Sequence, residues 1–180
     1  AYPTSAADVR ALLAYAQVTP EAITHSPNAD WLTYHGDYSA RRHSSLTQIT
    51  PANAKSLVAQ WVFHVPDAKK LEATPIVYDG LMYVSNTNEM YALDARNGRK
   101  VWHYRASLAR GTRVNRGTAI LGDKVYFVTS DCHLIALHRS TGNLLFDVQY
   151  ASFDAGYTTS VAPLAIRNGI LVGVAGGGSG

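Results

Sequence analysis

The chain has a single cysteine, Cys132, among its 180 residues, so no disulfide bond can form within it. A buried free thiol is the usual state of such a residue. Charged residues make up only 16% of the chain, against roughly 25% in an average globular domain. The basic residues are scattered, so the net charge of +3 does not indicate nucleic-acid binding. Apolar residues make up 47%, which allows a buried core and excludes a disordered composition.

Long apolar runs are also absent. No stretch approaches the ~18 apolar residues that a membrane-spanning helix needs, so the sequence predicts no transmembrane segment. No basic-then-apolar leader opens the chain. The seven histidines show no zinc-ligand spacing with cysteine, so no metal ligands are predicted from these residues.

The N-terminal part is predicted to contain short helical pieces separated by turns. Apolar side chains recur at helical spacing over residues 5–16, with Ser5 as the N-cap. Residues 20–36 are rich in Pro, Asn and Gly, which indicates turns. A second helical turn is predicted at Thr50-Pro51, with Thr50 as its N-cap and Pro51 at the first helical position.

From residue 57 the pattern changes to short strands rich in β-branched and aromatic residues. Two-residue hairpin turns are predicted at Asp79-Gly80, Gly122-Asp123 and Asn168-Gly169. The predicted strands cover residues 58–65, 74–78, 81–84, 90–93, 99–104, 118–121, 125–128, 134–137, 144–148, 162–166 and 170–173.

The order of strands repeats with a period of 44 residues. Ala92-Leu93 returns as Ala136-Leu137, and Gly98 returns as Gly142. Four short strands in a unit of about 40–45 residues are typical of a β-propeller blade. The sequence therefore predicts an all-β fold with about three four-stranded blades, of which two are nearly complete and the third is begun. We divide it into an N-terminal helix and opening segment at 1–56 and a partial β-propeller at 57–180.

Large aromatic residues recur with the repeat. Trp61 and Trp102 lie 41 residues apart, and Phe146 continues the series. A recurring aromatic in a repeat protein usually belongs to the interface between units. We therefore expect these rings to pack between adjacent blades instead of stacking on a cofactor.

Two motifs carry a resemblance to a known family. The run ALDARNGRKVW at residues 92–102 resembles the tryptophan-docking motif of quinoprotein dehydrogenases, and its copy at 136–146 is degenerate. The runs DWLTYHGDYS at 30–39 and LTQITP at 46–51 are similar to the opening segment of the pyrroloquinoline quinone (PQQ) alcohol dehydrogenases. The resemblance covers residues 30–180 and implies the N-terminal part of an eight-bladed propeller with PQQ near its axis.

The resemblance also implies cofactor-binding residues. Glu72 is similar to a glutamate that hydrogen-bonds the quinone, and Arg116 to an arginine beside the reactive carbonyl oxygens, where a fixed cation stabilises negative charge. Ser160 stands where the family usually has a threonine that binds a PQQ carboxylate. A small-residue loop contacts the carboxylate side, where glycine allows close backbone approach. The implied set is Glu72, Arg116, Ser160, Ala175, Gly176 and Gly177.

Simpler interpretations remain open for these residues. Glu72 and Arg116 could form an ordinary ion pair between blades, because charged groups that are buried are usually paired. Ser160 could be a plain strand hydroxyl, and the glycines could form a turn or a flexible linker.

The chain departs from the family at two places. Adjacent cysteines that often precede the Asn-Arg-Gly segment are replaced by Arg110 and Gly111, so the vicinal disulfide cannot form. The glutamate that usually binds Ca²⁺ is replaced by Gly178, which offers no side-chain oxygen. The resemblance places the catalytic aspartate and the remaining Ca²⁺ ligands beyond residue 180.

The resemblance implies a periplasmic enzyme, from which a signal peptide has been removed, that oxidises an alcohol by hydride transfer to PQQ. Ca²⁺ would assist, and cytochrome c would accept the electrons. The alternative is a non-catalytic periplasmic propeller scaffold. A third hypothesis is a ring formed by several copies of the chain, since an open stack of blades exposes edge strands.

Overall fold

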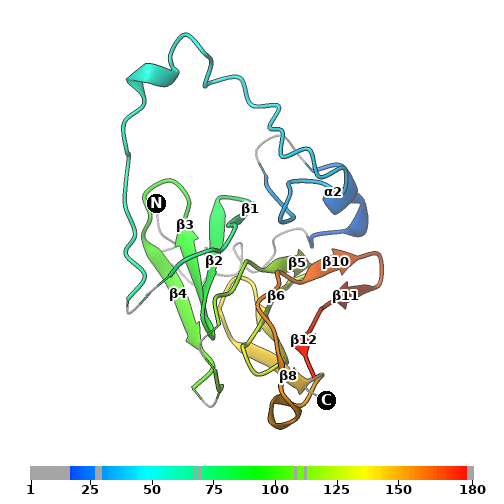
Figure 1. Cartoon of the computed structure of the whole chain (residues 1–180). Coiled ribbons are helices and arrows are strands. Elements are labelled where there is room, and N and C mark those ends of the chain that lie inside the picture. The colour runs from blue at the N-terminus through cyan, green and yellow to red at the C-terminus, as the bar shows by residue number, and fades with distance from the viewer. Residues whose placement is uncertain are drawn as a thin grey trace, which may run out of the picture.

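The computed structural model describes residues 17–26, 30–66, 68, 70–107, 109–111 and 113–177. Two four-stranded antiparallel sheets follow each other along the chain and lie side by side (Figure 1). In each sheet every strand pairs with the next one in sequence, as in a propeller blade. The strands of the first blade are β1 Ile76–Tyr78, β2 Leu81–Asn86, β3 Glu89–Asp94 and β4 Lys100–Arg105, and those of the second are β5 Ala119–Leu121, β6 Lys124–Val128, β7 His133–His138 and β8 Leu144–Gln149.

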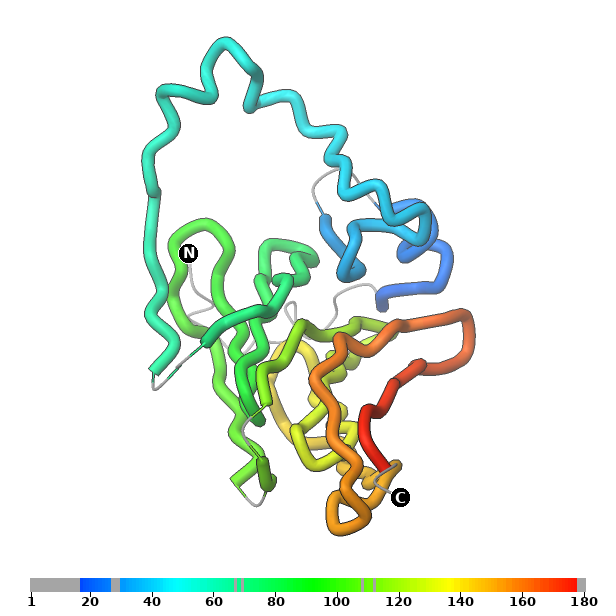
Figure 2. The backbone as a smooth tube through the Cα atoms, viewed as in Figure 1, coloured from blue at the N-terminus to red at the C-terminus, as the bar shows by residue number. Residues whose placement is uncertain are grey.

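A third unit begins after the second blade, as predicted. One hairpin pairs β10 with β11, and a second antiparallel pair joins β9 to β12. The short helix η2, Phe153–Ala155, comes directly before β9. In Figure 2 this third unit lies beside the second blade. Its strands are β9 Tyr157–Thr158, β10 Leu164–Ile166, β11 Gly169–Leu171 and β12 Ala175–Gly176.

The 44-residue period is also visible in the pairing of strands. Both β3 and β7 pair with the following strand, and each ladder has one register shift. The shift falls at Ala92/Leu93 in the first blade and at Ala136/Leu137 in the second. Equivalent residues therefore occupy equivalent positions in the two blades, down to the irregularity.

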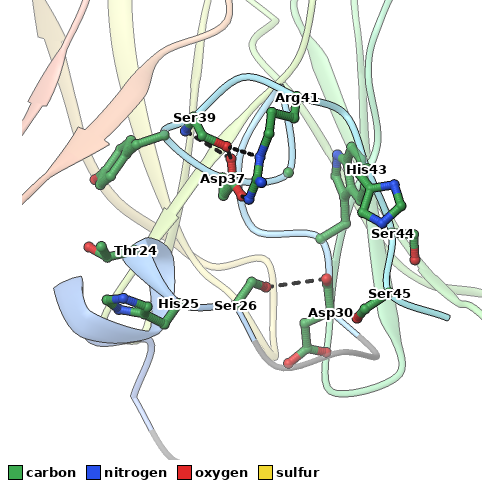
Figure 3. A pocket seen from close by; sticks show the side chains of 13 residues that line it. Thr24, His25, Ser26, Asp30, Asp37, Ser39, Arg41, His43, Ser44 and Ser45 are labelled. Atoms are coloured by element: carbon green, nitrogen blue, oxygen red, sulfur yellow. Dashed lines mark hydrogen bonds and ion pairs between the residues drawn. The ribbon is translucent and has the colours of Figure 1, made fainter.

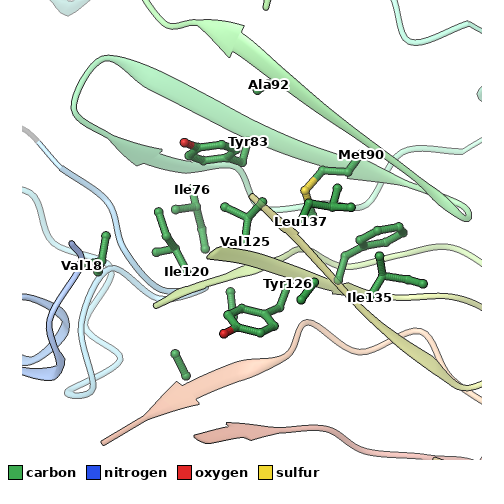
Figure 4. Packing of buried hydrophobic residues seen from close by; sticks show 14 of the residues in the cluster. Val18, Ile76, Tyr83, Met90, Ala92, Ile120, Val125, Tyr126, Ile135 and Leu137 are labelled. Atoms are coloured by element: carbon green, nitrogen blue, oxygen red, sulfur yellow. The ribbon is translucent and has the colours of Figure 1, made fainter. Parts of the chain in front are cut away.

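The main core lies between the two blades (Figure 4). Tyr83 and Met90 of the first blade are fully buried, and so are Val125 and Leu137 of the second. Because neither blade can cover this apolar face alone, the blades stabilise each other.

Each tryptophan of the repeat lies on a glycine of the following blade, which confirms the packing predicted for Trp61 and Trp102. Phe146, for which the same packing was predicted, is 36% exposed, and its ring contact is with Tyr126 of its own blade. The Trp102 Nε1–H donates to the Arg139 carbonyl at 2.9 Å, and a Cβ at Gly142 would lie 2.7 Å from the Trp102 ring. Trp61 repeats the contact one blade earlier: its Nε1–H donates to a backbone carbonyl at 3.1 Å, and a Cβ at Gly98 would lie 2.4 Å from its ring. We call this contact the tryptophan–glycine dock.

Two predicted hairpin turns are confirmed and one is displaced. Asp79 and Gly80 both have positive φ, +50° and +75°, which is typical of a type I′ turn. Gly122-Asp123 joins β5 to β6. In the third unit Ile166 pairs with Gly169, so the turn residues are 167–168 and Gly169 already belongs to β11.

The predicted strand at 58–65 is absent. The segment packs Trp61, Phe63 and Val65 against the first blade, whereas Val58 and Val62 are about 70% exposed. A strand needs a hydrogen-bonded neighbour, and the described residues place none beside this segment. Its residue types were those of a strand, but its partner is missing from the described part of the chain.

The helix predicted at residues 5–16 lies outside the described residues, and the other helical predictions were partly wrong. The second helical turn is present as η1, Ala54–Ser56, but its N-cap is Asn53 instead of Thr50. Residues 20–36 were predicted to be turns, whereas Pro20–Thr24 form helix α2. Thr19 caps α2 by accepting a bond from a backbone N–H at 3.2 Å.

The N-terminal strap, which we define as the described residues between 17 and 39, contacts all three units. It contributes fully buried apolar side chains to the core at three positions, Val18, Ile23 and Leu32. Hydrogen bonds attach it to the first strands of the blades or to the turns beside them. They join Trp31 to Val77 of β1 at 2.8 and 2.9 Å, Val18 to Gly122 at 2.7 and 3.0 Å, and the Tyr38 hydroxyl to the Ala165 carbonyl of β10 at 2.6 Å. The division of the chain at residue 56 stays a prediction.

We expect Gly142→Ala to destabilise the chain more than Gly122→Ala. Both glycines have positive φ, +74° and +63°, so either alanine costs about 1–2 kcal/mol in backbone strain. Only the Cβ at 142 would collide with a ring, because at 122 it meets nothing within 4 Å. The collision adds about 1–3 kcal/mol, which urea unfolding of the two variants would measure. Equal losses would contradict the tryptophan–glycine dock.

The turn that receives Trp61 is held by a buried carboxylate. Asp94, whose side chain is 7% exposed, accepts bonds from the Arg96 backbone at 3.0 Å and from its guanidinium at 2.8 and 2.9 Å. These bonds, the Arg96 side chain first, lower the pKa of Asp94 from 3.8 to about 2. Because the pKa is lower in the folded state, the stabilisation is present above pH ~4 and is lost as the pH falls towards 2.

Asp94→Asn is therefore expected to remove a pH-dependent part of the stability. Between pH 5 and pH 2 the original chain should lose about 2 kcal/mol more unfolding free energy than the variant. Urea unfolding at three pH values in this range measures the difference. If the two proteins lose stability in parallel, the carboxylate does not have this role.

Candidate functional site

Three of the predicted site residues occupy equivalent positions in consecutive units. Glu72, Arg116 and Ser160 are each separated by 44 residues, which is the repeat period. The Thr74 N–H donates to the Arg116 carbonyl at 3.0 Å, and the Arg116 N–H donates to the Ser160 carbonyl at 3.2 Å. A parallel bridge also pairs Thr74 with Gly117. The segments that lead into the first strands therefore lie side by side, and they bring the three side chains together.

Arg116 contacts both of the other residues. Its Nη2 lies 3.3 Å from Glu72 Oε2, and its Nη1 donates to Ser160 Oγ at 2.5 Å. Lys70 Nζ contacts the second oxygen of Glu72, Oε1. Lys70 first, and Arg116 after it, hold the pKa of Glu72 below its usual value. The result is a fixed carboxylate between two cations, which confirms that Glu72 and Arg116 form an ion pair between units.

The charged groups of this cluster remain accessible. The Glu72 side chain is 26% exposed and that of Arg116 is 46% exposed. A guanidinium that is held on two sides still has N–H groups to offer. The cluster can therefore contact a ligand through Arg116 without breaking its internal bonds.

The predicted loop Ala175, Gly176 and Gly177 packs against residues 156–158 of the third unit. β12 pairs with β9, so that Ala175 lies opposite Thr158. A Cβ at Gly176 would lie 2.3 Å from the Gly156 carbonyl oxygen, and one at Gly177 would lie 2.2 Å from the Tyr157 ring. Both glycines have positive φ. Packing against residues 156–157 explains why glycine is needed here, whereas we had attributed it to the approach of a ligand.

Sequence reasoning missed Lys70, whose ammonium group contacts Glu72. Successive side chains of an extended segment alternate in direction, so residues two apart share a face. Lys70 is two residues before Glu72, and this spacing could have indicated the contact. The common 44-residue spacing of Glu72, Arg116 and Ser160 was likewise present in the sequence and went unused.

Two cavities of the described residues lie outside this cluster. One, of about 560 Å³, is formed within residues 24–45 (Figure 3). The other, of about 480 Å³, is lined by Trp31, Arg42 and residues 73–75 and 77. It reaches the residue next to Glu72, but Glu72, Arg116 and Ser160 line neither cavity.

The structure also bears on what the sequence indicated about Cys132, metal ligands and membrane-spanning helices. Cys132 is fully buried, as predicted for a free thiol, and burial raises the pKa of its thiol. Among the residues that the structure describes, no group of three or more His, Cys, Asp or Glu side chains is placed to hold a metal ion. Gly178, which replaces the expected Ca²⁺ ligand, lies outside the described range. No helix in the described part is long and apolar enough to cross a membrane.

Comparison with known proteins gives a matching family and relatives whose names agree with it. Residues 31–150 match the family described as PQQ glucose/ethanol/alcohol dehydrogenase, β-propeller domain. The 1-butanol dehydrogenase (quinone) of Thauera butanivorans is 38% identical over 165 residues, which are 86% of this chain and 26% of the relative. The 1-butanol dehydrogenase (cytochrome c) of the same organism is 33% identical over 173 residues, 91% of this chain and 25% of the relative.

A solved structure agrees with these relatives. The quinohemoprotein alcohol dehydrogenase ADHIIG of Pseudomonas putida HK5 superimposes with a TM-score of 0.84 and 31% identity, covering 91% of this chain and 26% of that one. The all-β propeller fold predicted from the repeat is thus confirmed. The chain spans about a quarter of the length of the relatives it matches. Because the family match covers 31–150 of the 180 residues, the chain belongs to the β-propeller domain family of the PQQ-dependent glucose, ethanol and alcohol dehydrogenases.

Proposed function

We propose that this chain is part of a PQQ-dependent alcohol dehydrogenase and that Glu72, Arg116 and Ser160 form one side of its quinone site. The observation that carries the proposal is the position of Arg116. It is bonded to both other residues at equivalent places in three consecutive units, and its side chain is 46% exposed. An ordered cation at the edge of a propeller axis suits an anionic ligand near that axis.

The chemistry of the donor set fits this cofactor. PQQ is a planar ortho-quinone with three carboxylates, so it needs a cation and hydrogen-bond donors in fixed positions. Arg116 offers a planar fork of N–H groups, and its bonds to Glu72 and Ser160 hold that fork in place. Lys70 lies on the other side of Glu72 and compensates its charge. Ala175, Gly176 and Gly177 would add backbone groups on the carboxylate side.

The cofactor would supply the two-electron acceptor for the hydride of a primary alcohol, which also loses a proton and leaves as an aldehyde. Arg116 would stabilise the negative charge that grows on oxygen near its guanidinium, and it would do so without moving. Glu72 keeps Arg116 oriented and stays ionised. The catalytic aspartate and the Ca²⁺ ligands would come from residues outside this chain. Gly178 has no side-chain oxygen, so its side chain would not be one of these ligands.

The proposal extends to substrate and partners. A primary alcohol is in keeping with the two 1-butanol dehydrogenases among the relatives. Cytochrome c as the electron acceptor is supported by the name of one of them. We also propose a periplasmic location, as the resemblance to the quinoprotein family implies.

One observation favours the second candidate, a non-catalytic propeller scaffold. Arg116, Glu72 and Ser160 satisfy one another, and packing alone explains Gly176 and Gly177. Such contacts would also hold blades together in a protein that binds no cofactor. The two candidates differ in whether the cluster binds PQQ.

Calorimetric titration of the chain with PQQ in the presence of Ca²⁺ separates them. We expect Arg116→Ala to raise the dissociation constant about 10-fold or more, because a hydrogen bond to a charged group is lost. Glu72→Ala combined with Arg116→Ala should abolish measurable binding.

The matched control is Arg105→Ala. Arg105 is also paired with a glutamate, Glu89, and its side chain is similarly exposed, but it lies on β4, which is separated in the sheet from β1 by β2 and β3. This variant should bind PQQ as the original chain does. If Arg116→Ala and Arg105→Ala have the same affinity, the cluster is not a quinone site and the scaffold is favoured.

A further inference from the structure

Arg110 joins three parts of the chain through three different contacts. Its backbone N–H donates to Asp131 Oδ2 at 2.8 Å, in the turn between β6 and β7. Its Nη1 lies 2.8 Å from Asp154 Oδ1, in η2 of the third unit. Its guanidinium also lies over the Phe153 ring, 4.7 Å from the centroid. Arg110, which lies in the segment between the first and second blades, is thus attached to both the second blade and the third unit.

Gly111 makes the same passage tight. Its φ is +81°, and a Cβ at this position would lie 3.0 Å from Ser130 Cβ and 3.3 Å from the Phe153 ring. Its carbonyl accepts a bond from Asn88 Nδ2 at 3.3 Å, and Asn88 Oδ1 in turn accepts one from the Ser130 N–H at 2.8 Å. The chain therefore passes between two units with little room for a side chain at 111.

Two of the three partners of Arg110, Phe153 and Asp154, lie in η2, which leads directly to the candidate site. η2 is followed by β9, which pairs with β12 and its residues Ala175 and Gly176. Ser160, which binds the Arg116 side chain, comes two residues after β9. Arg110 itself lies six residues before Arg116. Arg110 thus connects the segment that carries Arg116 to the segment that carries the other candidate ligands.

We propose that Arg110 is a positioning residue for the quinone site: through Asp154 and Phe153 it fixes the spacing between Arg116 and the β9–β12 pair. This inference rests on the proposed function. No disulfide can do this work in the chain, because Cys132 is its only cysteine. The fastening is therefore electrostatic and aromatic, and it does not respond to oxidants or reductants.

The exposure of the Arg110–Asp154 ion pair predicts that salt weakens it. Arg110 and Asp154 are 51% and 78% exposed, so salt screens their attraction. Hydrogen bonding between them lowers the pKa of Asp154 and raises that of Arg110, so both stay charged across the neutral range. The stacking of a planar guanidinium on Phe153 cannot be replaced fully by the ammonium of lysine.

The first readout is hydrogen exchange of the chain without any cofactor. Arg110→Ala should speed exchange of the backbone amides of β9 and of residues 113–117 roughly 3- to 10-fold, since an ion pair and a cation–π contact are lost. Arg110→Lys should give an intermediate value. Asp154→Ala should resemble Arg110→Ala, and the double variant should be no worse than either. High salt should speed exchange in the original chain and change little in Arg110→Ala.

The second readout is the dissociation rate of PQQ, which should rise by a similar factor in Arg110→Ala although Glu72 and Arg116 are intact. The control is Arg41→Ala, which removes another exposed ion pair, the one that Arg41 forms with Asp37 of the N-terminal strap. It should change neither quantity.

The outcomes are distinguishable. Unchanged exchange in Arg110→Ala overturns the fastening, whatever PQQ does. Faster exchange with an unchanged PQQ dissociation rate overturns the positioning role. If the original chain binds no PQQ in a way that depends on Arg116, the proposed function fails and the positioning role falls with it, while the exchange data still decide whether Arg110 joins the units.

Discussion

A tryptophan ring that lies on a glycine of the next blade determines how the units of this protein stand to one another. Trp102 lies on Gly142, and Trp61 lies on Gly98, each with an indole N–H bonded to a backbone carbonyl of the same turn. A side chain at either glycine would push the ring away, so the blades can approach only at this distance. With the blades held so, the segments that lead into their first strands run side by side. The cluster of Glu72, Arg116 and Ser160 is a consequence of that arrangement, because the three residues share one position in the repeat.

Segments with little regular structure complete the connections that the blades cannot make themselves. The N-terminal strap reaches all three units through Val18, Trp31 and Tyr38. Arg110 and Arg116 both cross to the third unit from the segment between the first and second blades. Connections of this kind depend on single side chains instead of ladders of backbone hydrogen bonds. They are therefore the places where one substitution changes the geometry of the candidate site without unfolding a blade.

The sequence was informative wherever the cause of a structure is local or periodic. Runs of β-branched and aromatic residues, turn residues such as Asp79-Gly80 and the 44-residue period predicted both complete blades and the start of the third. It failed where a partner decides the outcome: residues 58–65 have strand composition but no neighbouring strand among the described residues. Helix α2 was missed although Thr19-Pro20 carries the same cap and proline signal that was used at Thr50-Pro51. For the site, the resemblance supplied Glu72 and Arg116, whereas Lys70 and the contacts of Arg110 depend on the folded chain and emerged only from the structure.

The central claim is that equivalent positions of consecutive blades place Glu72, Arg116 and Ser160 around one ligand. A crystal structure of the protein grown with PQQ tests this claim most directly. The account predicts that the cofactor lies within hydrogen-bonding distance of Arg116, with the bonds from Arg116 to Glu72 and Ser160 still in place. A structure in which PQQ binds elsewhere, or in which Arg116 points away from it while its bonds to Glu72 and Ser160 persist, would contradict the account.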